Sequence, residues 1–215
     1  MIKFWQFLSV CLSLMIFVVT VPVIFLATKP FVSLHYSLLP NNVDQKSAAQ
    51  ESLAILTSFQ KSTQSQSRFA SIKQSGQILP LYTPLEVDHL VDVKKRFDVV
   101  RLAAVVSFIL LVSQAYIFKP VEFVRQLYKS SVLGLFIVMI SGVLLLTSWN
   151  WLFVTFHEVL FPAGNWSFSE TSGLIQLFPE IFWFRFGLAW IGTILLILVA
   201  LTLISKRIIK RSSPN

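Results

Sequence analysis

Four long apolar runs, each bounded by charged residues, constrain this chain more than any other feature of its sequence. They occupy residues about 4–27, 99–118, 131–151 and 184–205. A helix that crosses a bilayer needs about 20 apolar residues, because its backbone groups must be hydrogen-bonded inside the segment. Charged residues make up only 13% of the chain, against about 25% in soluble domains. The sequence therefore predicts an all-α membrane protein, a single integral membrane domain with four transmembrane helices.

The distribution of lysine and arginine orients these predicted spans. Four basic residues and no acid follow the fourth span, and the short connection between the second and third spans carries three basic residues and one acid. Short basic segments stay on the cytoplasmic side of a membrane. Both termini are therefore expected in the cytoplasm, with extracytoplasmic segments at about 28–97 and 152–182. These topology charges account for the formal net charge of +8, so nucleic acid is not an expected partner.

The long segment after the first span contains a stretch rich in Ser and Gln, residues 41–76. Val43, Leu53, Leu56 and Phe59 stand near helical spacing in this polar background. Such spacing is typical of a short amphipathic helix that lies on a membrane or on a helix bundle. We expect such a helix here, and disorder is the alternative.

A helix start is predicted at the end of the same segment. Thr83 is suited to the N-cap position, and Pro84 is suited to the first helical position, where its missing N–H costs nothing. Glu86 stands three residues after Thr83 and completes a capping box. The helix is expected to begin at residue 84 and to run into the second span.

His89 and Asp92 lie on this predicted helix, three residues apart, so they share a face. A carboxylate one turn away can orient an imidazole and hold it in one tautomer. The alternative is that these residues form only a solvated polar face beside the membrane.

His157 and Glu158 follow the third span, in the stretch FVTFHEVLFPAGNW. A band of aromatic residues lies just before this pair: Trp149, Trp151, Phe153 and Phe156. Aromatic side chains prefer the membrane–water interface. His157 is therefore expected near the outer headgroups, within reach of lipid esters. The alternative is an interfacial histidine that anchors the span.

Three histidines, His35, His89 and His157, are the candidate acid–base groups, and all three are predicted to be extracytoplasmic. No GxSxG motif marks a serine nucleophile, and the single cysteine, Cys11, lies inside the first apolar run. A neutral imidazole can accept a proton from an attacking amine or hydroxyl and return it to a leaving alkoxide. We therefore expect histidine acid–base catalysis without a cofactor.

A metal site is the open alternative for the same residues. His89, Asp92, His157 and Glu158 carry groups that can bind a metal, but no HExxH or HxH spacing places two ligands together. The ligands would have to converge from separate segments, so no metal is expected.

Three motifs, taken in order along the chain, resemble the lipoprotein intramolecular transacylases called Lit and related integral membrane proteins of Gram-positive bacteria. They are HLVDVK at residues 89–94, FHEVLFPAGNWSF at residues 156–168 and LIQLFPEIFW at residues 174–183. The motifs are specific in combination rather than singly, and the resemblance extends to the four-span architecture.

This resemblance implies an enzyme of the bacterial cell membrane, an acyltransferase with an extracytoplasmic active site. Its substrate is a lipoprotein whose N-terminal cysteine carries an S-diacylglyceryl group and a free α-amine. One acyl chain moves from the glycerol to that amine, which gives a lyso-form lipoprotein with an N-acyl and an S-monoacylglyceryl group. Because the substrate supplies both the nucleophile and the ester, proximity contributes much of the rate.

The resemblance also implies roles for particular residues. His157 is expected to be the general acid–base, and His89 is expected to be a second essential histidine. Five residues are expected to support them: Asp92, Glu158, Asn165, Trp166 and Glu180. Backbone amides or Asn165 are expected to stabilise the oxyanion. The sequence itself, with Arg185 one to two turns after Glu180, favours a structural ion pair between these two residues over a catalytic role for Glu180. The diacylated lipoprotein and the surrounding membrane phospholipid are the expected partners.

Two rival functions stay open. One is another membrane lipid hydrolase or acyltransferase, with or without a metal, and the other is a non-enzymatic membrane accessory protein. Residues 169–173 contain only Glu170 where more acidic residues are expected in such transacylases. We therefore expect substrate preference or activity to differ from the family pattern.

Overall fold

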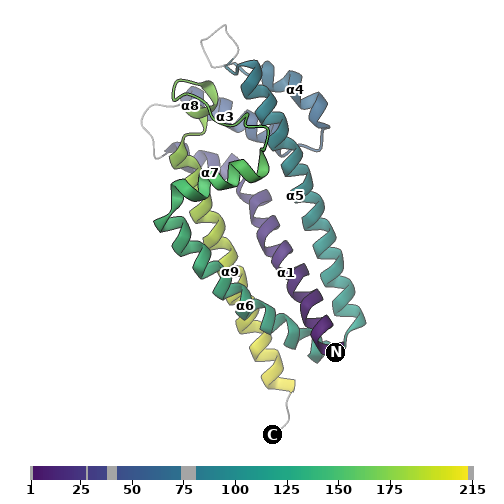
Figure 1. Ribbon diagram of the computed structural model, residues 1–215. Coiled ribbons are helices and arrows are strands. Elements are labelled where there is room, and N and C mark those ends of the chain that lie inside the picture. The colour runs from purple at the N-terminus through teal and green to yellow at the C-terminus, as the bar shows by residue number, and fades with distance from the viewer. Residues whose placement is uncertain (1, 28, 38–42, 74–80, 213–215) are drawn as a thin grey trace. The chain divides into compact units, whose positions relative to one another are not determined.

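The computed structural model describes residues 2–27, 29–37, 43–73 and 81–212 (Figure 1). Its helices are α1 (Ile2–Leu26), α2 (Lys29–Ser37), α3 (Val43–Leu56), α4 (Ser62–Ala70), α5 (Pro84–Ile117), α6 (Pro120–Thr147), α7 (Trp149–Leu160), α8 (Gly173–Leu177) and α9 (Glu180–Ser212). Within the described residues, α1, α5, α6 and α9 are long and apolar enough to cross a membrane. The predictions of an all-helical chain and of four candidate spans are therefore confirmed.

The helix that forms the predicted third span ends before the end of that predicted span. We expected it to run to residue 151, but α6 ends at Thr147. Ser148 has a non-helical backbone, with φ −138° and ψ 36°, and a new helix, α7, begins at Trp149. The predicted aromatic band and His157 therefore lie on a separate helix rather than on an extension of the span.

The chain divides into two compact units, which are described separately. Unit 1 comprises Met1–Val23, Val100–Thr147 and Leu188–Asn215, and unit 2 comprises Ile24–Val99 and Ser148–Gly187. The three helices α1, α5 and α9 each contribute residues to both units.

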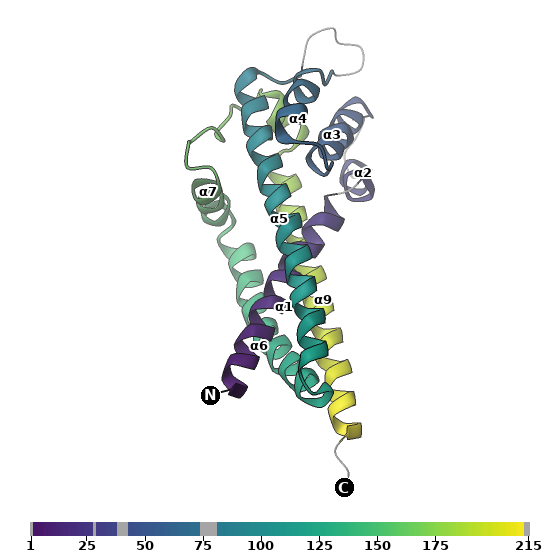
Figure 2. The same ribbon diagram turned by 90° about the vertical axis from the view of Figure 1, so that its right-hand side faces the viewer.

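Unit 1 is a bundle of apolar helices that run side by side (Figures 1 and 2). Its core is formed by Leu14, Val18, Val138, Ile194 and Leu198. Side-chain hydrogen bonds between its helices include Trp190 Nε1 donating to the Val19 carbonyl at 2.9 Å and Gln114 Nε2 donating to Ser13 Oγ at 3.2 Å. Close packing and such hydrogen bonds hold helices together in lipid, where burial of apolar surface supplies no driving force.

Unit 2 has its own apolar core, built from α2, α3, α4, α8 and the parts of α5 and α9 that belong to it. Helix α3 contacts α2, α4 and α8, as Figures 1 and 2 show. Leu53 and Leu56, part of the predicted amphipathic pattern, are buried in this core, whereas Phe59 lies beyond the helix end and is exposed. A helix is therefore present in this stretch. Contact of α3 with a membrane stays a prediction.

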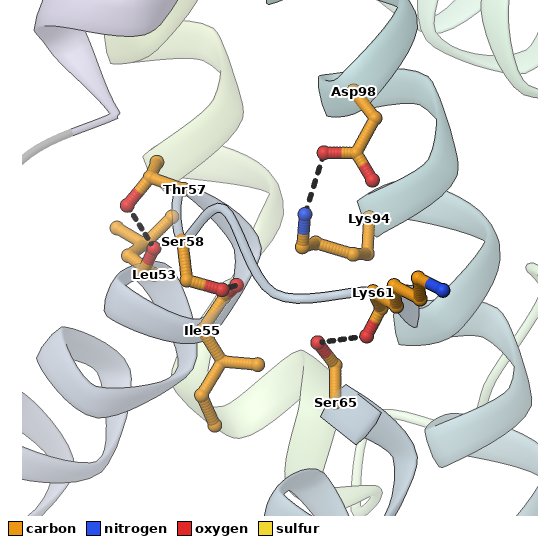
Figure 3. A network of polar contacts seen from close by, with 8 residues as sticks. All are labelled: Leu53, Ile55, Thr57, Ser58, Lys61, Ser65, Lys94 and Asp98. Atoms are coloured by element: carbon orange, nitrogen blue, oxygen red, sulfur yellow. Dashed lines mark hydrogen bonds and ion pairs between the residues drawn. The ribbon is translucent and has the colours of Figure 1, made fainter. Parts of the chain in front are cut away.

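Lys94 belongs to the unit-2 part of α5 and forms an ion pair within that helix (Figure 3). Its side chain is fully buried, and its Nζ lies 2.6 Å from Asp98 Oδ1 one turn later on α5. In the connection between α3 and α4, the hydroxyls of Thr57 and Ser58 donate to the carbonyls of Leu53 and Ile55 in the last turn of α3. A buried ammonium is tolerated because a carboxylate neutralises it.

The predicted capping box at the start of α5 is confirmed. The Thr83 amide donates to Glu86 Oε2 at 2.7 Å, and the Glu86 amide donates to Thr83 Oγ1 at 3.3 Å. Glu86 is buried, and its Oε1 also accepts from the backbone amide of Leu174 at 2.8 Å. One carboxylate thus fixes the start of α5 and the first turn of α8. The two backbones also come close beside this link, since a side chain on Gly173 would meet the Leu81 carbonyl.

We predict that Glu86→Ala lowers the midpoint of thermal unfolding of the full chain in detergent. The buried Leu174 amide loses its acceptor, and a buried unsatisfied donor costs about 1–3 kcal/mol. Asp88→Ala is the matched control, because Asp88 is an exposed carboxylate in the same turn of α5. Equal midpoints for the two variants would contradict this role of Glu86.

Candidate functional site

Helix α5 places His89 in the interior of unit 2. The imidazole is 6% exposed, and its Nδ1 is buried without a hydrogen-bond partner among the described residues. The ring of Phe161 lies 4.7 Å from it, and the ring of Phe168 lies 5.7 Å away, measured between centroids. His89 therefore stands in an aromatic environment that disfavours its charged form.

Helix α7 places His157 and also sets its tautomer. Nδ1 of His157 lies 2.7 Å from the carbonyl oxygen of Phe153, one turn earlier. A carbonyl only accepts hydrogen bonds, so Nδ1 carries a proton. In the neutral imidazole Nε2 is then unprotonated and can act as a base. The indole ring of Trp166 lies 5.0 Å from this imidazole.

The two imidazoles face each other across a short gap. Their ring centroids are 6.3 Å apart, and their planes are inclined by 26°. Phe161 contacts both, since its ring also lies 5.8 Å from that of His157. Residues 68 positions apart in the sequence thus come together inside one compact unit.

A turn after α7 brings Asn165 back to α5. Gly164 has a φ of +75°, a left-handed conformation that favours glycine, and its amide donates to the Phe161 carbonyl at 3.0 Å. Asn165 Nδ2 then donates to Asp92 Oδ2 at 3.1 Å. Arg96 adds a second link between the segments, because its Nη2 donates to the Leu160 carbonyl at 2.8 Å.

Asp92 holds Asn165 rather than His89. Its Oδ2 accepts from Asn165, and its Oδ1 accepts from Lys95 Nζ at 2.8 Å. These contacts keep the pKa of Asp92 below its usual value against the opposing effect of burial. Asp92 therefore affects His89 through its charge, and the expected orienting hydrogen bond is replaced by these two. The Oδ1 of Asn165 is buried without a partner in the described part of the chain.

Burial lowers the pKa of both imidazoles. The membrane-crossing part of α5 is predicted to begin near residue 99, so both groups lie outside the predicted spans. Burial and then the nearby His157 lower the pKa of His89 to about 4, although the charge of Asp92 opposes this shift. Burial also lowers the pKa of His157, and the hydrogen bond to Phe153 partly offsets the effect. Both histidines are therefore neutral at pH 7.

The remaining predicted residues lie apart from this pair of imidazoles. Glu158 is exposed on α7. Glu180 accepts from Trp149 Nε1 at 2.5 Å, whereas Arg185 Nη1 lies 3.4 Å from His35 Nδ1. The expected pair of Glu180 with Arg185 is absent from the ion pairs of the described residues, because each side chain has another neighbour. No group of three or more His, Cys, Asp or Glu side chains within the same residues is arranged to hold a metal ion.

Sequence reasoning did not assign roles to four residues of the site. They are Phe153, whose carbonyl sets the tautomer, Lys95, which holds Asp92, and the two aromatic walls Phe161 and Phe168. Helical spacing contains a signal for three of them: Phe153 and Phe161 stand four residues on either side of His157, and Lys95 stands three after Asp92. Phe168 carries no such signal, since it lies outside a helix.

The fold and the four apolar helices define a multi-pass membrane protein. Residues 6–183 match the model of the family described as lipoprotein intramolecular transacylase Lit. The chain therefore belongs to the Lit family, as the sequence motifs predicted.

Two individual proteins are similar to this chain. The solved structure of the membrane integral lipoprotein intramolecular transacylase Lit from Bacillus cereus matches with a TM-score of 0.76 and 16% identity, covering 98% of this chain and 97% of that chain. An uncharacterized protein from Aquifex aeolicus (strain VF5) is 26% identical over 103 residues. That match spans 48% of this chain and 46% of the relative, which is less than half the length of either.

We predict that both histidines titrate below the ordinary value of 6.5 in the folded protein, His89 near pH 4. Between about pH 4 and pH 6.5 the folded state binds fewer protons than the unfolded state, so the free energy of unfolding rises with pH. The contribution of the two neutral histidines to the free energy of unfolding is complete above about pH 6.5 and is lost as the pH falls toward about 4. NMR of histidine-labelled full chain in micelles checks the titration, with His89→Gln and His157→Gln assigning the signals. A midpoint for His89 at 6.5 or above would contradict the buried environment.

Proposed function

We propose that this chain is a lipoprotein intramolecular transacylase. It moves an acyl chain from the S-diacylglyceryl group of a lipoprotein's N-terminal cysteine to the α-amine of that cysteine. The observation that carries the proposal is the pair of neutral imidazoles, 6.3 Å apart, in a member of the Lit family. A reaction in which the substrate supplies nucleophile and ester needs proton transfer and positioning from the enzyme, and such a pair provides both.

His157 is the general acid–base in this proposal. Its unprotonated Nε2 accepts a proton as the α-amine nitrogen attacks the ester carbonyl carbon. The bond between that carbon and the glycerol oxygen then breaks, and the imidazolium returns the proton to the glycerol oxygen. An amide and a free glycerol hydroxyl result, so no water and no external acyl donor is consumed. Nδ1 keeps its proton and donates it in a hydrogen bond to the Phe153 carbonyl throughout, which keeps the ring in one orientation.

His89 forms the opposite wall of the site and shares the proton transfer. Its low exposure and its aromatic neighbours keep it neutral, so it does not repel an imidazolium at His157 during the reaction. The contact of Phe161 with both rings keeps the two imidazoles at a constant separation.

Asn165 serves as a hydrogen-bond acceptor for the attacking amine. Its Nδ2 is engaged by Asp92, so the amide presents Oδ1, which has no partner among the described residues. An acceptor cannot stabilise an oxyanion, and this replaces the role expected from the sequence. An α-amine that attacks through its lone pair still carries N–H groups, and in this proposal Oδ1 accepts a hydrogen bond from one of them.

The site acts at the outer surface of the cell membrane in this proposal. The positive-inside pattern of the short segments puts α7 and the start of α5 on the extracytoplasmic side. There, a diacylated lipoprotein presents its glycerol esters at headgroup depth, with membrane phospholipid around it.

We predict that the full chain, expressed in a bacterium without its own N-acylation activity, converts a diacylated lipoprotein to the lyso form. Mass spectrometry of the N-terminal peptide should show an unchanged mass, with fragments that place one acyl chain on the amine. His157→Ala should abolish the conversion, because the base is removed. Val159→Ala, an exposed site on the same helix, is the matched control. Conversion by the folded His157→Ala protein would contradict the mechanism.

We predict that Asn165→Leu slows transacylation about 10- to 100-fold, the effect of losing a hydrogen bond of about 1.5–3 kcal/mol. Lys95→Met is the matched control, because it removes the other partner of Asp92 and leaves the Asn165 oxygen in place. The rate is measured with purified protein and a diacylated lipopeptide. Equal losses in both variants would show that only the anchoring of Asp92 matters.

A further inference from the structure

A cavity in unit 1 lies among side chains that the proposed reaction does not use. It has a volume of about 410 Å³ and is lined by Lys3, Phe4 and Phe7 of α1 and by Glu122, Arg125, Gln126 and Lys129 of α6. Sites for small ligands have volumes of roughly 300–1,000 Å³. The cavity therefore has room for a headgroup-sized molecule.

The charges around this cavity favour an anion. Three cationic side chains line it against one carboxylate. Glu122 Oε2 accepts from Arg125 Nη1 at 3.3 Å, so this pair is neutral as a unit. Lys3 and Lys129 form no ion pair with a described residue. Two uncompensated ammonium groups thus remain at the cavity wall.

Gln126 favours a bound molecule that can donate a hydrogen bond. The residue is 1% exposed, and its Nε2 donates to Glu122 Oε1 at 2.5 Å. This bond fixes the orientation of the amide, because a carboxylate accepts only from the NH₂ end. The Oε1 atom is buried without a partner among the described residues. An unsatisfied buried acceptor is costly, and a hydroxyl of a bound molecule would satisfy it.

The surroundings of the cavity are those of a lipid headgroup. Phe4 and Phe7 line it, and Phe4 and the neighbouring Trp5 are 61% and 63% exposed. Aromatic side chains beside lysines are typical of the membrane–water interface. The basic first turns of α6 are predicted to face the cytoplasm, where anionic lipids attract clustered basic residues.

We propose that this cavity binds the headgroup of an anionic phospholipid that carries free hydroxyls, namely phosphatidylglycerol. Lys3 and Lys129 bind the phosphate, a glycerol hydroxyl donates to Gln126 Oε1, and the acyl chains extend along the exposed apolar side chains of α1. A zwitterionic phosphatidylethanolamine fits less well, because its ammonium group would lie beside two lysines.

Native mass spectrometry of the full chain with equal amounts of phosphatidylglycerol and phosphatidylethanolamine tests the charge requirement. The intact chain should retain phosphatidylglycerol preferentially. The Lys3→Gln and Lys129→Gln double variant should lose this preference, by about fivefold for each lysine removed. The matched control is the Lys206→Gln and Lys210→Gln double variant, which removes the same charge from exposed positions of α9 outside the cavity.

Phosphatidylmethanol tests the hydroxyl requirement, since it carries the same charge without a glycerol hydroxyl. The intact chain should prefer phosphatidylglycerol over it, and Gln126→Leu should remove that preference while retention of both anionic lipids continues. Equal retention of phosphatidylglycerol and phosphatidylethanolamine by the intact chain would overturn the proposal. Equal effects of the two lysine double variants would overturn it too, because they would show general attraction to a basic protein.

Discussion

The buried carboxylate of Glu86 is the interaction on which the arrangement of unit 2 depends. It accepts from the Thr83 amide at the start of α5 and from the Leu174 amide at the start of α8. A fixed helix start determines which way every later side chain of α5 points, since side chains recur with the helical period. His89 lies one turn after Glu86 on this helix, and α8 ends the connection that begins after α7. The same carboxylate therefore anchors both segments that form the site.

The environment of the two histidines follows from burial combined with one well-placed acceptor. Aromatic rings exclude water and lower the pKa of each imidazole. The Phe153 carbonyl then selects which nitrogen of His157 carries the proton. Asp92 and Asn165 add polarity at the edge of this apolar region, and Oδ1 of Asn165 is buried without a partner among the described residues. The proposed reaction needs few catalytic groups from the protein because its substrate supplies the nucleophile.

The sequence predicted those features that depend on local signals. The four apolar helices follow from run length, and the start of α5 at Pro84 follows from the spacing of Thr83 and Glu86. The family was predicted from three short motifs. Helical spacing does not predict contacts between segments that are distant in the sequence. Three such contacts are those of His89 with His157, Asp92 with Asn165, and Arg185 with His35. The break at Ser148 was missed because apolar residues continue on both sides of it.

In the proposed mechanism His89 and His157 act as one acid–base unit. A double-mutant cycle of His89→Ala and His157→Ala tests this, measured on the residual rate of acyl transfer to the α-amine by a large excess of each purified variant. The effects of replacing residues that act as a unit are strongly non-additive, so the double variant is expected to lose no more activity than the worse single variant. Losses that multiply in the double variant would show two independent roles and would contradict the claim.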